Sequence, residues 1–319
     1  MTTYIIRRLL TAVLVIVLVS LAVFFVMHLL PGDPLMIHLG ELDSVGDMTE
    51  KMLQELRHEF GLDKPLPLQY ISWMAGIFRG DFGTSVLYRE KVANLMLECY
   101  PVTVHLGILA FLLSGFLGIC IGLLAGLRRG QWIDQLTTVF AYLGVATPSF
   151  WLGILMIYVI GLKLHLLPIS GYTPPTSDFW QSTRQIVMPV ICLSIHGLAS
   201  TARQMRTSII EVMHRDYIRT AWAKGLAKTD IVRRHALKNS LIPVITVIGF
   251  NIRVIFGGSV IVETVFAVPG VGRLLVSSIF GHDYVVVQSI TLVLAVAIVL
   301  TNLIVDLSYG WLDPKIRYD

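Results

Sequence analysis

Residues 9–30 read LLTAVLVIVLVSLAVFFVMHLL and contain no Asp, Glu, Lys or Arg. A helix needs about 20 apolar residues to cross the hydrocarbon core of a bilayer, and it leaves none of its backbone polar groups unpaired there. This run therefore predicts a transmembrane helix at the start of the chain. A cleaved signal peptide is the alternative, but the run exceeds the roughly 7–15 apolar residues of a signal sequence, and no small-residue cleavage site follows it.

The whole chain has the composition of a membrane protein. Of its 319 residues, 55% are hydrophobic and 14% are charged, and the mean hydropathy is +0.73. Soluble domains average about 45–50% apolar and about 25% charged residues. The third of six long apolar runs contains Pro148, so it fits either one kinked helix or two short elements, and we favour one kinked helix. The six predicted spans are residues 9–30, 102–127, 136–162, 186–202, 241–262 and 284–305.

Lys and Arg are distributed in a way that favours one orientation. Residues 203–238 hold nine Lys and Arg against three Asp and Glu, and Arg7, Arg8, Arg128 and Arg129 form two smaller basic groups. Short basic loops stay in the cytoplasm. All three basic groups lie there if the third apolar run crosses the membrane once. The sequence therefore predicts an all-α polytopic membrane protein with six transmembrane helices and both termini in the cytoplasm.

A long polar segment between the first two spans is predicted to face outward. Residues 49–60 and 68–78 each place apolar side chains at helical spacing, which indicates two short helices in this segment. The predicted parts are a first transmembrane helix at 1–30, an extracytoplasmic loop at 31–101, a five-helix permease core at 102–310 with a cytoplasmic segment at 203–240, and a cytoplasmic tail at 311–319.

The sequence contains no standard catalytic motif. It has no G-x-x-x-x-G-K-[ST], H-E-x-x-H or G-x-S-x-G pattern, so we expect no catalytic residue and no bound ATP in this chain. Its nine histidines show no metal-ligand spacing, and we expect no metal or other cofactor. His105 and His196 fall inside predicted spans, where a polar side chain usually faces a cavity or a partner helix. A net charge of +4 is too small to indicate a nucleic-acid partner.

Small residues recur every four positions along the second predicted span. They are Ala110, Ser114, Gly118, Gly122 and Gly126, which we call the small-residue seam. Small side chains let two helix backbones approach closely, and this is a common basis for helix association in lipid. The pattern indicates a packing contact with another helix. A sliding surface in a gated pathway has the same pattern and stays open as the alternative.

Arg253 is a single basic residue within the fifth predicted span. Such a side chain costs a few kcal/mol in lipid unless it faces water or an acid. Two hypotheses follow. Arg253 lines a substrate pathway and meets anionic groups, or it is neutralised by Asp306 or Glu263.

The basic cytoplasmic segment contains a short amphipathic helix pattern. Ile218, Ala221, Trp222 and Gly225 lie at i, i+3, i+4 and i+7 and form a small apolar stripe, and glycine in a left-handed turn can end the helix. The stripe predicts a helix that lies in a groove of another protein. The alternative is a basic helix lying on anionic lipid.

At this segment the sequence resembles the EAA loop of permease subunits from binding-protein-dependent ABC importers, in the form found in dipeptide, oligopeptide, glutathione and nickel permeases. Arg219 and Thr220 replace the Glu and the first Ala of the general motif, as in that subgroup. The residues that carry the resemblance are Asp216, Tyr217, Ile218, Arg219, Thr220, Ala221, Trp222, Ala223, Lys224, Gly225 and Leu226. Similar family motifs lie in order along nearly the whole chain, at 30–34, 61–65, 80–83, 148–151, 234–237, 257–263, 268–272 and 312–318.

The resemblance implies an assembly in the bacterial inner membrane. Such permeases have the type I ABC importer fold, pair with a second homologous permease and bind two cytoplasmic ATPases, which hold ATP and magnesium. A substrate-binding protein delivers the substrate from outside. The helix at 217–225 is then the coupling helix, which contacts an ATPase.

Substrate class and mechanism still have alternatives. The resemblance favours di- or oligopeptides, with nickel or a metal chelate and glutathione as alternative substrates. An ion-gradient secondary transporter is a second mechanism, but it predicts acidic residues at mid-membrane, and the predicted spans have none. A membrane scaffold that only recruits a partner is a third.

Overall fold

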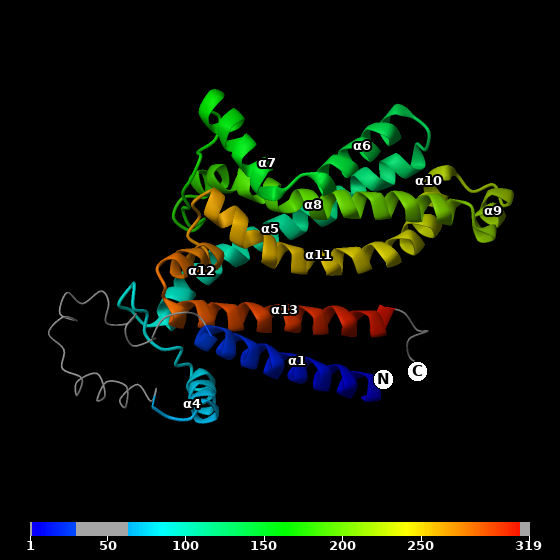
Figure 1. Cartoon of the computed structure of the whole chain (residues 1–319). Coiled ribbons are helices and arrows are strands. Elements are labelled where there is room, and N and C mark those ends of the chain that lie inside the picture. Colours follow the sequence, from blue (N-terminus) through cyan, green and yellow to red (C-terminus); the bar gives the residue numbers. More distant parts are fainter. Residues whose placement is uncertain (1, 30–62, 313–319) are drawn as a thin grey trace. The chain divides into compact units, whose positions relative to one another are not determined.

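The computed structural model describes residues 2–29 and 63–312, and Figure 1 shows them as a set of helices. Within these ranges the only β contact is an isolated bridge between Thr84 and Lys91, so the predicted all-α class is confirmed. The predicted helix at 49–60 and the residues 313–319 of the tail lie outside the described part. The helices are α1 (Thr2–Leu29), α4 (Leu66–Phe78), α5 (Val92–Leu127), α6 (Trp132–Ala146), α7 (Ser149–Met156), α8 (Phe179–Met213), α9 (Asp216–Ala223), α10 (Lys228–Asp230), α11 (Leu237–Val265), α12 (Val271–Phe280) and α13 (Tyr284–Leu312), with π-helical stretches at Ile157–Lys163 and Ile231–Ala236.

Four of the described helices, α1, α5, α8 and α13, are long and apolar enough to cross a membrane. Two further bent pairs raise the number to 6 if each pair is one span. The last span, Tyr284–Val305, has the bounds predicted from the sequence. The short helix predicted at 68–78 is also present, as α4, which begins two residues earlier.

The third predicted span is a broken pair and not one kinked helix. Trp132–Ala146 and Ser149–Lys163 meet at 105°. The break lies at Thr147, whose backbone is extended (φ −81°, ψ 121°), because the proline ring of Pro148 disfavours helical geometry in the residue before it. Proline therefore ends α6 and begins the next helical segment.

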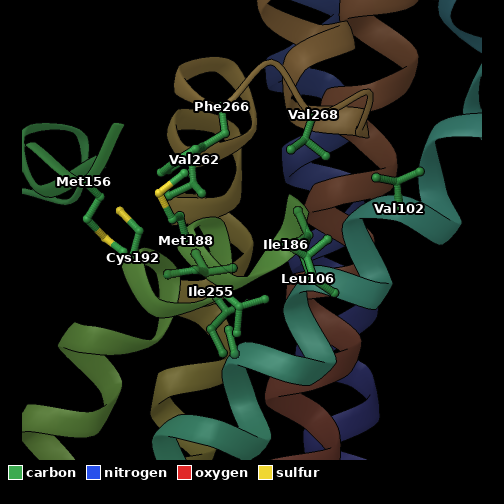
Figure 2. Packing of buried hydrophobic residues seen from close by; sticks show 13 residues of the cluster. Val102, Leu106, Met156, Ile186, Met188, Cys192, Ile255, Val262, Phe266 and Val268 are labelled. Atoms are coloured by element: carbon green, nitrogen blue, oxygen red, sulfur yellow. The ribbon is translucent and has the colours of Figure 1, made fainter. Parts of the chain in front are cut away.

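Of the described residues, 2–8, 101–273 and 300–312 form one compact unit. Its central helix is α8, which packs against α6, α7 and α11 and lies between α6 and α11 in Figure 1. Asp178 caps the start of α8 by accepting a hydrogen bond from the Gln181 backbone N–H at 2.9 Å. Figure 2 shows the apolar core of the unit, in which Leu106 of α5, Met188 of α8 and Phe266 after α11 are buried.

The second unit consists, among the described residues, of 9–29, 63–100 and 274–299. Tyr70 and Trp73 of α4 lie against Phe24 of α1, with ring centroids 5.5 and 5.9 Å away. Asp283 is fully buried and accepts hydrogen bonds from Ser85 Oγ at 2.5 Å and from the Leu87 backbone N–H at 3.1 Å. These bonds attach the chain before α5 to the turn before α13.

Candidate coupling site

Within the basic segment, residues 216–223 fold as the short helix α9, at the far end of α8 and α11 from α7 (Figure 1). Asp216 lies in its first turn, where a carboxylate interacts favourably with the helix dipole. Gly225 ends the helix with φ +77°, as predicted. The Gly225 N–H donates to the Trp222 carbonyl at 2.9 Å, and the Leu226 N–H donates to the Ala221 carbonyl at 3.4 Å. This pair of bonds is a Schellman ending, which requires a left-handed residue.

The apolar stripe of α9 does not lie on a free surface. Ile218 is fully buried and Ala221 is 6% exposed. Both belong to an apolar cluster with α8 and with the segment after α9, so the prediction that this stripe lies in a partner's groove is wrong for these two residues. The other buried members of this cluster are Met205, Ile209, Ile231, Ala236 and Val244.

The rest of the α9 surface, which flanks and faces away from this buried stripe, is aromatic and basic. Tyr217 and Trp222 are 43% and 44% exposed, and Arg219 and Thr220 are exposed between them. The Asn239 Nδ2 donates to the Tyr217 hydroxyl at 3.1 Å, which orients this ring. We call Tyr217, Arg219, Thr220 and Trp222 the exposed face of α9. The remaining predicted coupling residues are exposed as well, namely Asp216, Lys224, Gly225 and Leu226.

An ion pair with a buried carboxylate connects α6 to the C-terminal part of α8. Arg206 Nε pairs with Asp134 Oδ1, and Arg206 Nη2 donates to Oδ2 at 3.0 Å. The Gly130 backbone N–H adds a bond to Oδ2 at 2.9 Å. The side chain of Asp134 is only 5% exposed and that of Arg206 is 30% exposed. Two-point contact of a guanidinium with a carboxylate fixes direction as well as distance, so the pair positions the α8 segment that leads to α9.

The small-residue seam of α5 packs against α8. A Cβ atom on Gly122 would lie 2.3 Å from the Ala202 carbonyl oxygen, and one on Gly126 would lie 2.2 Å from Ile209 Cγ2. Such distances leave no room for a side chain. The packing interpretation is therefore confirmed: α5 and α8 approach backbone to backbone.

Glu263 lies in a buried cradle at the end of α11. It is fully buried and accepts hydrogen bonds from Thr103 Oγ1 at 2.8 Å and from the backbone N–H groups of Gly272 and Arg273 at 2.7 and 3.1 Å. The last two belong to the first turn of α12, whose free N–H groups favour a carboxylate. A Cβ on Gly270 would lie 2.4 Å from the Glu263 carboxyl group.

The side chains of Arg253 and Asp306, which the two hypotheses about Arg253 involve, lie outside the described part. Glu263 is engaged by Thr103 and by the α12 backbone. His105, noted as a polar residue within a span, contacts a partner from a loop: its Nδ1 lies 3.0 Å from the Tyr172 hydroxyl.

The ion pair and the Glu263 cradle were not predicted from the sequence. Long apolar runs dominate the sequence pattern. Asp134 lies just before one of these runs, close to Arg128 and Arg129. A single acid next to a basic turn is a usable signal for a buried partner. Its pairing with Arg206 joins positions 72 residues apart, and no spacing rule gives that pairing.

We expect Glu263→Gln to lower the free energy of unfolding by about 1–2 kcal/mol, because the amide presents an NH₂ group where backbone donors need an acceptor. The measurement is SDS titration of the purified protein in mixed micelles. Thr264→Val is the matched control: this side chain is exposed, and its hydroxyl donates to the Val260 carbonyl in its own helix. Equal losses for both variants would contradict a structural role of the cradle.

Comparison with known proteins assigns the chain to a family. Residues 118–318 match the family described as binding-protein-dependent transport system inner membrane component, and residues 1–107 match the corresponding N-terminal family. The chain is 37% identical over 318 residues to a probable peptide ABC transporter permease of Sinorhizobium fredii, with 100% of both chains covered. It is 35% identical over 338 residues to a di/tripeptide transport system permease of Pseudomonas aeruginosa, with 100% and 99% covered, and 36% identical over 318 residues to a glutathione transport system permease of Escherichia coli, with 100% of both covered. The chain belongs to the binding-protein-dependent transport system inner membrane components, and it is a permease subunit of the bacterial inner membrane.

Proposed function

We propose that this permease forms the translocation pathway of an ATP-driven importer for di- or oligopeptides, together with a second homologous permease. Membership of the family implies ATP-binding and substrate-binding partner proteins. The peptide substrate is supported by the names of full-length relatives from Sinorhizobium and Pseudomonas. In this proposal two ATPases bind ATP and magnesium in the cytoplasm, where both termini of the permease also lie.

The single observation that carries the mechanism is the division of α9 into two faces. Its exposed face presents Tyr217 and Trp222, residue types enriched at the centres of protein interfaces. Its other face is fixed to the permease, since Ile218 and Ala221 are buried. An ATPase that binds the exposed face thus moves α9 together with the segments of α8 and α11 that share this apolar cluster. ATP binding and hydrolysis then bias the permease between two conformations by differential binding.

Trp222→Ala tests the ATPase contact. We expect the permease to bind its ATPase partner about 30-fold more weakly, which corresponds to the 2 kcal/mol or more lost when an aromatic residue central to an interface is truncated. The measurement is the affinity of the purified ATPase for the permease in nanodiscs. Peptide uptake in vesicles should fall with it.

The matched control for that experiment is Trp132→Ala, which removes another strongly exposed tryptophan at the start of α6. It should leave the ATPase affinity unchanged. Unchanged affinity in the Trp222 variant would exclude the exposed face as the contact. Uptake that proceeds without any ATPase would instead support an ion-gradient mechanism.

Glutathione is the second candidate substrate, and the relative from Escherichia coli favours it. Glutathione is itself a small peptide, so the same hydrogen-bonding groups in a translocation pathway suit glutathione and short peptides. The nickel alternative has no such support from these three relatives. Mass spectrometry of the ligand bound to the cognate binding protein distinguishes the substrates: a mixture of short peptides is expected, while glutathione alone or a metal would change the assignment.

A further inference from the structure

The central helix α8 has an unusual combination of properties among the described long helices. Its most apolar 18-residue stretch is less hydrophobic than those of α1, α5 and α13. It is also the most buried of these four helices: 61% of this stretch is buried, against at most 28% in α1, α5 and α13. A helix with few lipid contacts can carry polar residues, so the part of α8 that stays uncovered is informative.

The uncovered part of α8 includes a polar stripe. His196 and Ser200 are half-buried, and Arg203 and Thr207 are exposed. Their spacing of four, three and four residues places them along one side of an α-helix. We call these four residues the polar face of α8. No acidic side chain lies within 4.0 Å of the Arg203 cation among the residues that the structure describes.

Hydrogen bonds fix one end of this polar face to the next helix. The Ser200 hydroxyl lies 3.2 Å from Asn251 Oδ1 of α11 and 3.0 Å from the Gly197 carbonyl. Asn251 is itself buried and donates to the Gly197 carbonyl and to Thr201 Oγ1, each at 3.2 Å. The polar groups behind the face are therefore satisfied within the protein, whereas the imidazole of His196 and the guanidinium of Arg203 are left to solvent or a solute.

The uncovered side of α5 has the opposite character. Its exposed residues Ile108, Leu112 and Phe116 repeat every four positions and are all large and apolar, as expected for a side that contacts lipid. In lipid the imidazole of His196, which lies within the predicted span 186–202, would cost free energy, whereas Arg203 lies just beyond that span. Polar side chains in spans therefore face water or another protein.

We propose that the polar face of α8 lines the water-filled route through which the substrate passes. Its occupants are water and the polar amide backbone of a short peptide, for which hydroxyl, imidazole and guanidinium groups offer hydrogen bonds. The identity of the peptide rests on the proposed function. The presence of water at this face rests only on the geometry of α8.

Cysteine accessibility tests this proposal. Single cysteines replace His196 and Ser200 in a chain whose Cys99, Cys120 and Cys192 are changed to alanine, and the assembled transporter is studied in membrane vesicles of both orientations. The probe is a charged, membrane-impermeant methanethiosulfonate, which reacts with a thiolate in water. We expect both positions to react at least 10-fold faster than the matched controls Ile108→Cys and Leu112→Cys on α5.

The possible outcomes distinguish a failure of the polar-face proposal from a failure of the proposed importer mechanism. Labelling of His196→Cys and Ser200→Cys as slow as that of the α5 controls would overturn the proposal, whether lipid or a dry protein contact covers the face. Ser200→Cys changes a single atom and keeps the test valid if the histidine variant does not assemble. Fast labelling whose rate does not change with ATP or with peptide-loaded binding protein would support the water-filled face while contradicting ATP-driven import. Slow labelling together with normal ATP-driven uptake would refute only the proposal about the polar face.

Discussion

Asp134→Asn should lower the free energy of unfolding by about 3 kcal/mol. The substitution leaves the half-buried guanidinium of Arg206 without its charge partner, and breaking one side of such a pair costs about 3–5 kcal/mol. It also weakens the acceptor of the Gly130 backbone N–H. SDS titration of the purified permease in mixed micelles measures the loss.

A surface pair at the end of α8 provides the control. Glu211 and Arg215 pair across one turn of chain with side chains 63% and 59% exposed, so Glu211→Gln should cost less than about 1 kcal/mol. A double-mutant cycle with Asp134→Asn and Arg206→Met adds a second criterion. If the two losses simply add, the pair contributes no coupling and its positioning role is refuted.

Gly122→Ala is expected to cost roughly 3 kcal/mol, at the upper end of the range for overpacking. The new methyl group would lie 2.3 Å from the Ala202 carbonyl oxygen and 2.8 Å from Met205 Cβ. Backbone and Cβ atoms cannot rotate away, so α5 and α8 must separate. The amount of folded permease recovered from membranes and its thermal unfolding temperature measure the effect.

Gly115→Ala on the same helix is the matched control. Its Cβ would lie 3.8 Å from Ile248 Cδ1, an ordinary contact, and alanine favours a helix over glycine by about 1 kcal/mol. This variant should be unchanged or slightly more stable. Equal destabilisation of both variants would show that the seam is not closely packed.

The sequence predicts the individual helices of this protein better than the contacts and angles between them. Residues 284–305 contain no charged side chain and become a candidate span with the same bounds, because a span is recognised from composition and length. Gly225 likewise ends α9, since a left-handed residue is a local requirement. Pro148 showed that the third run is irregular, but the angle of 105° depends on what the two helices pack against.

The face of α9 illustrates the limit for the candidate site. Helical spacing groups Ile218, Ala221 and Trp222 on one apolar stripe. The structure buries the first two within the permease and leaves the tryptophan exposed. Periodicity specifies that a face is apolar, whereas only the neighbouring helices specify whether it contacts its own chain or a partner.

The sequence by itself determined the membrane environment, the helical class, the close approach of α5 to another helix and the end of α9 at Gly225. These follow from composition, four-residue spacing and local turn geometry. The tertiary structure decided which helix receives the small-residue seam, which acid pairs with Arg206 and which side of α9 is free. Those features join residues far apart in the chain, and the free energy of each contact depends on packing that no local pattern encodes.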